Sequence, residues 1–177
     1  GPGLSSVQFL HYKKGKIFEW IRKNTAQDAL IAGHPTHIDA VMLFGERTAF
    51  ATTETAHPFY TQYFKEIKRR LELSLRAHYA QDLKTVVDLL QPEGVDYFVF
   101  NRMRFYPDAL AREKFFEPLH GLVRELASKP AESYAFKQLP QQVDPKVFPF
   151  VVFRDQQSVV VDLNALAKYY QNVDNNE

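Results

Sequence analysis

The sequence contains no cysteine, which excludes disulfide frameworks and thiolate metal sites. It has only 7 glycines and no glycine-rich run, so it lacks the loop that cradles a phosphate or a dinucleotide. No apolar stretch approaches the roughly 18 residues of a membrane-spanning helix. The 22 basic and 21 acidic side chains leave a net charge of +1. A nucleic-acid-binding surface shows a clear basic excess, so we expect no nucleic-acid partner.

The chain does have abundant apolar and aromatic residues. Of its 177 residues, 45% are hydrophobic, with 15 Phe and 9 Tyr. This length and composition predict one domain with a phenylalanine-rich core, or with an aromatic surface for a sugar or a membrane. We expect that domain at residues 4–171. Residues 1–3 resemble the remnant of a cleaved tag, and residues 172–177 form a frayed tail.

Three short apolar runs, at residues 29–33, 48–51 and 95–100, each stop at a polar cluster. An apolar stripe of period 3.6 fills residues 60–90, with a break at Gln81 and Asp82, and connects the second run to the third. Such a long helical connection suits a crossover between parallel strands. The sequence therefore predicts an α/β fold with a mainly parallel central sheet flanked by helices.

The remaining elements are predicted from shorter patterns. Helices are expected at residues 15–23, 115–126 and 163–170, with a loop or short helix at 38–44. The stretch 128–145 is rich in Pro, Gln and Ser and reads as loop. Two apolar segments, 148–153 and 158–163, flank a polar turn and predict a C-terminal β-hairpin.

Polar side chains follow each of the three apolar runs. His34, His37 and Asp39 follow the first run, Glu54 and His57 the second, and Arg102 the third. The carboxyl ends of parallel strands share one edge of a sheet, where ligands bind in open α/β folds. Imidazole, carboxylate and guanidinium groups together can accept a polyhydroxyl or anionic group without a metal. The sequence predicts a ligand site here, with no catalytic residue and no cofactor.

Two other interpretations of these residues remain open. Neutral imidazoles and carboxylates are suitable ligands for a divalent metal, and Asp39 with Glu54 could form an acid/base pair. However, His34 and His37 do not have the spacing that aligns two rings on one helical turn. Alternatively, all of these side chains only cap strand and helix ends and pair with one another.

Several phrases of the sequence resemble one family. A helix ending in Trp20-Ile21-Arg22-Lys23-Asn24-Thr25 leads into Asp28-Ala29-Leu30-Ile31-Ala32. Arg47 precedes a strand, and Tyr79-x-x-Asp82-Leu83 heads a helix that ends before Gly94-Val95-Asp96-Tyr97-Phe98-Val99. This order resembles the C-terminal extracytoplasmic domains of multi-spanning, C-class glycosyltransferase-like membrane proteins, some of them cyanobacterial. The resemblance covers residues 17–105.

The resemblance implies a non-catalytic accessory domain. In such enzymes the catalytic acids lie in loops between membrane helices, so no catalytic residue is carried over to this chain. The implied location is the periplasmic face of a membrane, and the implied partners are the transmembrane part of a parent protein and a glycan or lipid-linked sugar. The alternatives are a soluble metal-dependent or acid/base enzyme that uses the strand-end cluster, and a protein-interaction module.

Overall fold

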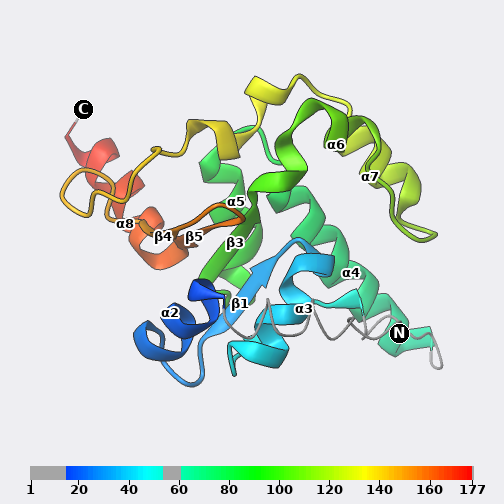
Figure 1. Ribbon diagram of the computed structural model, residues 1–177, viewed down its shortest axis with the longest axis horizontal. Helices are drawn as coiled ribbons and strands as arrows, with labels where there is room; N and C mark the ends of the chain where they lie inside the picture. The colour runs from blue at the N-terminus through cyan, green and yellow to red at the C-terminus, as the bar shows by residue number, and fades with distance from the viewer. Residues whose placement is uncertain (1–14, 54–60, 177) are drawn as a thin grey trace.

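The computed structural model describes residues 15–53 and 61–176, which form a β-sheet with helices on both faces (Figure 1). The strands are β1 (Leu30–Gly33), β2 (Thr48–Ala49), β3 (Tyr97–Asn101), β4 (Val151–Arg154) and β5 (Ser158–Asp162). The α-helices are α2 (Lys16–Asn24), α3 (Pro35–Phe44), α4 (Thr61–His78), α5 (Leu83–Leu90), α6 (Pro107–Ala111), α7 (His120–Leu126) and α8 (Leu163–Asn175). Short 3-10 turns are η2 (Gln91–Glu93), η3 (Arg102–Phe105), η4 (Ala131–Ser133) and η5 (Ala135–Gln138). The predicted α/β class is confirmed.

The five strands lie in the order β2-β1-β3-β5-β4. β1 pairs in parallel with both β2 and β3, as the three apolar runs predict. β5 pairs antiparallel with β3 and with β4, with an irregularity between Val151 and Phe153. The sheet is therefore mixed, and the prediction of a mainly parallel sheet is wrong.

The short connection between β4 and β5 explains the mixed sheet. A parallel neighbour requires a crossover of a dozen or more residues, whereas only residues 155–157 separate these two strands. β5 must therefore run opposite to β4. β5 also runs opposite to β3, its other neighbour.

Alternating side chains divide the core between the two faces of the sheet. Phe98 and Phe100 of β3 belong to the larger cluster, which includes residues from α4, α5 and α8. Val99, between them, belongs to the smaller cluster with residues from α2 and α3. Successive side chains of a β-strand point to opposite faces of the sheet, so both clusters pack against the same sheet.

The predicted break in the long apolar stripe separates α4 from α5. Asp82 caps α5, since its carboxylate accepts the backbone N–H of Thr85 at 2.7 Å. Leu71 and Leu75 on α4 and Leu83 on α5 are buried in the larger cluster. The stripe therefore packs both helices onto the sheet.

Three elements differ from their predicted form. Helix α7 begins at His120 instead of residue 115, because Pro118 offers no backbone N–H to a helix through this segment. The stretch predicted as loop contains η4 and η5 and buries Tyr134 and Phe136. Helix α8 continues past its predicted end to Asn175.

Candidate functional site

The carboxyl ends of β1 and β3 lie side by side, because the two strands are parallel neighbours. His34 directly follows β1, and η3 directly follows β3. The close approach requires glycine at position 33, since a Cβ atom there would lie 2.7 Å from the Val99 carbonyl oxygen. This edge is where the predicted strand-end residues can meet.

A cluster of polar side chains lies at these strand ends. We call it the buried polar cluster. Its buried members are His34, His78, Tyr79 and Glu113, and the half-buried Arg104 and exposed Thr36 complete it toward the surface.

Hydrogen bonds within the cluster determine which ring nitrogen of His34 carries the hydrogen. Arg104 Nη2 donates to the Thr36 hydroxyl at 2.8 Å. The same hydroxyl lies 2.8 Å from His34 Nδ1. The Thr36 backbone N–H donates to Nδ1, at 3.3 Å. Nδ1 is therefore an acceptor, and the neutral ring carries its hydrogen on Nε2.

The Nε2 atom of His34 faces Glu113 without a hydrogen bond. It lies 3.8 Å from the Glu113 carboxylate, and it has no hydrogen-bond partner among the described residues. Burial lowers the pKa of His34 well below its ordinary value, and the nearby His78 and Arg104 lower it further. His34 is 0% exposed, so a substrate does not reach its ring in this conformation.

Glu113 connects three separate parts of the chain. Its carboxylate accepts the Tyr79 hydroxyl at 2.6 Å and Arg104 Nη1 at 2.5 Å. Burial raises the pKa of Tyr79, and the neighbouring Glu113 charge raises it further, so the phenol remains a donor. These two bonds tie the segment after α6 to the end of α4 and to η3.

His78 is the second buried histidine of the cluster. Its Nε2 accepts the backbone N–H of Asn101 at 3.1 Å, and its ring stacks on Phe105 with centroids 4.8 Å apart. The ring also meets that of His34 edge-on, at 5.1 Å. Burial lowers the pKa of His78 well below its ordinary value, so it too is neutral near pH 7.

The other predicted site residues lie in separate environments. Asp39 accepts the backbone N–H of Thr53 at 3.1 Å and also its hydroxyl, so it fastens the segment after β2. Arg102 donates to the Asp155 carbonyl at 2.5 Å, on the side of the β4–β5 turn. Glu54 and His57 lie outside the described residues.

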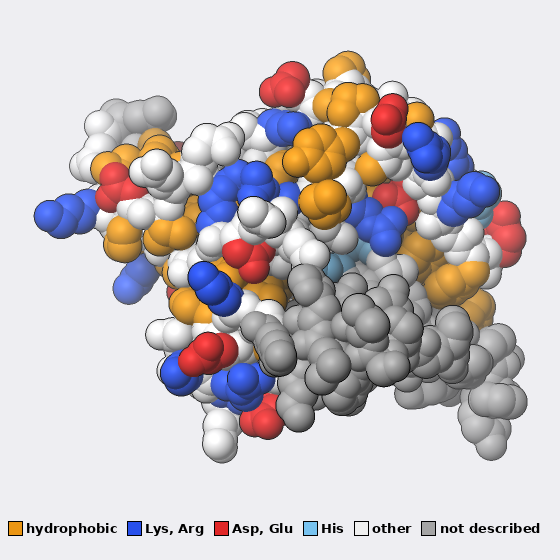
Figure 2. Space-filling model, in the orientation of Figure 1, with side chains coloured by type: hydrophobic (Ala, Val, Ile, Leu, Met, Phe, Trp, Pro, Cys, Tyr) orange, Lys and Arg blue, Asp and Glu red, His pale blue; other side chains and the backbone are white. Residues whose placement is uncertain are grey.

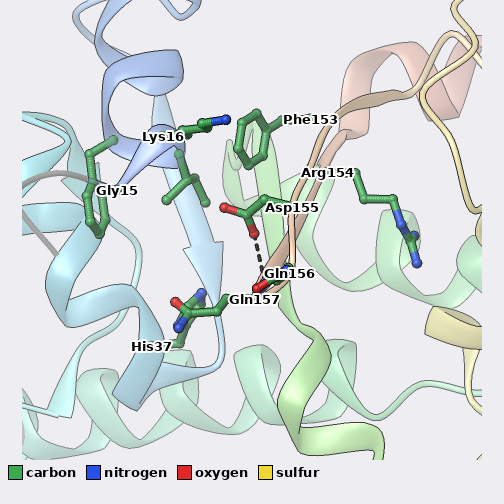
Figure 3. A pocket seen from close by; sticks show the side chains of 10 residues that line it. Gly15, Lys16, His37, Phe153, Arg154, Asp155, Gln156 and Gln157 are labelled. Carbon is green, nitrogen blue, oxygen red and sulfur yellow. Dashed lines mark hydrogen bonds between the residues drawn. The ribbon is translucent and has the colours of Figure 1, made fainter. Parts of the chain in front are cut away.

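His37 lines a cavity of about 560 Å³ between the start of α2 and the β4–β5 turn (Figure 3). We call this cavity the His37 groove. Its described lining consists of Gly15, Lys16, Ile17, Phe18, His37, Phe153, Arg154, Asp155, Gln156 and Gln157. The groove therefore combines apolar walls with imidazole, carboxylate, amide and ammonium groups.

Two hydrogen-bonded residues fix the polar side of the groove. His37 Nε2 bonds the Ser158 hydroxyl at 2.9 Å, and burial lowers the pKa of His37 to about 4. Asp155 accepts the backbone N–H groups of Gln157 at 2.8 Å and Ser158 at 2.7 Å. The turn is therefore held by its own carboxylate. Figure 3 shows the Arg154 side chain pointing away from His37 and Phe153.

Of the six members of the buried polar cluster, sequence reasoning identified only His34 as a site residue. Glu113 lies between Arg112 and Lys114, and this run of charges reads as a solvated surface. His78 and Tyr79 end a helix whose apolar period explains them without a special role. Only Arg104 could have been found from the sequence, because it follows the third apolar run, as Arg102 does.

No group of three or more His, Asp or Glu side chains within residues 15–53 and 61–176 is arranged to hold a metal ion. In the same part of the chain, no helix is both long and apolar enough to cross a membrane. No protein-family model matches this sequence, and no curated protein is significantly similar to it.

Proposed function

We propose that this chain is a non-catalytic accessory domain that binds a glycan in the His37 groove. The observation that carries the proposal is the mixed lining of the groove. Phe153 offers an apolar ring, while Asp155, Gln156 and His37 offer hydrogen-bonding groups. A sugar presents the matching surfaces, with apolar C–H faces and hydroxyl groups around its edge.

The charge of the groove favours a neutral ligand. Lys16 and Asp155 carry opposite charges, and burial keeps His37 neutral at pH 7. Arg154 contributes to the wall, but its side chain points away from the other labelled residues (Figure 3). A polyhydroxyl ligand thus fits this lining better than a strongly charged one.

The residues of the groove support binding more than glycoside cleavage. Hydrolysis of a glycosidic bond generally needs two carboxyl groups flanking the scissile bond. Among the described residues of the lining there is one, Asp155, and one of its oxygens already accepts two backbone N–H groups. The enzyme alternative instead relies on the strand-end His, Asp and Glu residues, of which His34 is fully buried and Asp39 bonds Thr53.

We place this domain on the periplasmic face of a membrane, as part of a glycosyltransferase-like membrane protein. This part of the proposal is supported by the sequence resemblance over residues 17–105. In that setting the groove would hold a growing or finished glycan beside the transmembrane part of the parent protein. The lipid-linked sugar itself would be bound by the parent.

Trp20 provides a direct test of glycan binding. It is the single tryptophan of the chain, and its ring centroid lies 5.8 Å from that of Phe153, which lines the groove. We expect its fluorescence to change when oligosaccharides of glucose or N-acetylglucosamine are titrated into the full chain. The double variant Gln156→Ala and Gln157→Ala should weaken this binding about tenfold or more.

The matched control is Gln171→Ala, an exposed glutamine of α8 outside the groove. Both variants should keep the wild-type melting temperature, because the side chains of Gln156 and Gln157 are exposed. No fluorescence change with any oligosaccharide, or equal affinity in the double variant, would contradict the proposal. Release of shorter sugars during the titration would favour the enzyme alternative.

A further inference from the structure

A second, smaller cavity lies beside the β4–β5 turn and carries several positive charges. Its volume is about 160 Å³. We call it the arginine pocket. Its described lining consists of Arg102, Tyr106, Phe136, Lys137, Gln141 and Arg154. Arg102 reaches it from η3, after the central strand β3, and Arg154 from the end of the edge strand β4.

The two guanidinium groups are bonded only to neutral oxygens. Arg102 Nη1 donates to the Asp155 carbonyl at 2.5 Å. Arg154 donates to the Pro140 carbonyl at 3.0 Å and to the Gln141 amide oxygen at 3.2 Å. Among the described residues, no carboxylate forms an ion pair with either group within 4.0 Å. Five N–H donors on each guanidinium leave several free for a ligand.

Partial burial makes this arrangement costly without an anion. Both arginines are half-buried, and the Arg154 guanidinium lies over the Phe136 ring, 5.9 Å from its centroid. Burial lowers the pKa of Arg154, and the neighbouring Arg102 charge lowers it further. Like charges brought together in a concave, partly desolvated place are offset most effectively by a bound negative charge.

The third cation of the pocket strengthens this argument. Lys137 lies on η5, and its ammonium is 4.0 Å from the Glu132 carboxylate, whose side chain is largely exposed. This is a weak, solvent-screened pair, so Lys137 remains able to contact a ligand. Figure 2 shows Lys and Arg side chains gathered beside exposed hydrophobic ones on the upper half of the visible face.

We propose that the arginine pocket binds a phosphate monoester group through Arg102, Lys137 and Arg154. Arginine forks match the oxygen spacing of a phosphate, and the small volume suits one such group instead of a whole nucleotide. The pocket adjoins the His37 groove at Arg154, which lines both, but the remaining described lining residues of the two cavities differ. This proposal does not depend on glycan binding.

A free phosphate and a lipid headgroup offer the same chemistry, and two experimental arms distinguish them. In the first, inorganic phosphate and glycerol 3-phosphate are titrated into the full chain by calorimetry. In the second, the chain is mixed with phosphatidylcholine vesicles with or without phosphatidic acid, and flotation is measured. Binding in the first arm identifies a soluble phosphate ligand. Flotation that requires phosphatidic acid, without binding in the first arm, identifies a lipid headgroup.

Charge-removing variants locate the site. We expect Arg154→Gln and Lys137→Gln each to weaken phosphate binding about tenfold. Arg76→Gln, which removes an exposed arginine from α4, should leave it unchanged. If Arg154→Gln impairs folding through the loss of its hydrogen bonds, the phosphate affinity of Lys137→Gln still tests the site. The double variant Gln156→Ala and Gln157→Ala should retain phosphate binding, which separates this proposal from the proposed function.

Three results would overturn the proposal. The first is no binding in either arm. The second is an affinity that Lys137→Gln and Arg154→Gln leave unchanged. The third is equal affinity for phosphate and chloride, which would indicate general attraction to basic side chains instead of a built site.

Discussion

The buried His34 and His78 and the partly buried His37 are neutral in the folded chain, and this makes stability depend on pH. Burial lowers the pKa of His34, His37 and His78 below the ordinary value of 6.5. Below pH 6.5 the unfolded chain therefore binds protons that the folded chain excludes. We expect the free energy of unfolding, measured with urea, to fall between pH 7 and pH 5. The slope contributed by each histidine should approach about 1.4 kcal/mol per pH unit once the pH is well below 6.5 and the folded ring is still neutral.

His37→Gln tests the contribution of a single histidine. An amide can keep a hydrogen bond to Ser158 but does not titrate, so the pH slope should fall by about one third. For His37 the stabilisation is complete above pH 6.5 and is lost as the pH approaches about 4. An identical slope in the variant would show that His37 is already protonated in the folded chain.

The Tyr79 hydroxyl is a second residue with a measurable contribution. Tyr79→Phe keeps the ring but removes one of the two hydrogen bonds to the buried Glu113 carboxylate. We expect a loss of about 1.5–3 kcal/mol in the free energy of unfolding. Tyr106→Phe is the control, because Tyr106 is 52% exposed, and it should change stability by less than about 0.5 kcal/mol. A smaller loss for Tyr79 would mean that water replaces the hydroxyl.

At the scale of elements, helix α4 is held to the sheet by one buried stripe. Leu71 is 1% exposed, so Leu71→Ala should cost about 2–5 kcal/mol through lost burial and a residual cavity. Leu73, two residues further along the same helix, is only partly buried, and Leu73→Ala should cost clearly less. Thermal unfolding of both variants makes the comparison. Equal losses would show that the stripe is not the packing face.

The contact between β1 and β3 gives a second element-scale prediction. Gly33→Ala would push a Cβ atom against the Val99 carbonyl oxygen, which is backbone and cannot turn aside. We expect a cost of about 1–3 kcal/mol in urea unfolding. Gly121→Ala in α7 should instead stabilise by about 0.5–1 kcal/mol, because nothing lies within 4 Å of its new Cβ atom. Tolerance of the first change would mean that the strands can separate.

At the scale of the whole molecule, both core clusters share the same sheet. Val99 and Val160 point to one face, while their chain neighbours Phe98 and Val161 point to the other. Neither face can lose its packing without the other, so we expect two-state unfolding. Trp20 fluorescence reports the smaller cluster, and far-UV circular dichroism reports all helices. Their transitions should coincide, and an earlier Trp20 transition would contradict this.

The sequence predicted the parts of the fold that depend on local order. The three apolar runs and the long helical connection are sufficient to make β1, β2 and β3 parallel neighbours. The place of β5 beside β3 could not be predicted, because this pairing joins segments that are about 60 residues apart by tertiary contact alone.

The candidate site, too, could be predicted only where it depends on local sequence order. His34 and His37 were predicted from their position after the first strand, and both belong to polar arrangements at that end of the sheet. Glu113 could not be predicted, since its burial depends on Tyr79 and Arg104, which come from two other elements. The groove itself depends on the β4–β5 turn, which lies more than 100 residues from His37 in the chain.

The two outer strands of the sheet have a consequence for behaviour in concentrated solution. Among the described residues, β2 and β4 form the edges. β2 has only two residues, and β4 carries an irregularity and ends in the positively charged Arg154. Neither edge offers a long, flat row of free peptide groups for another copy to extend. The short and irregular edge strands therefore protect the chain against edge-to-edge aggregation into fibrils.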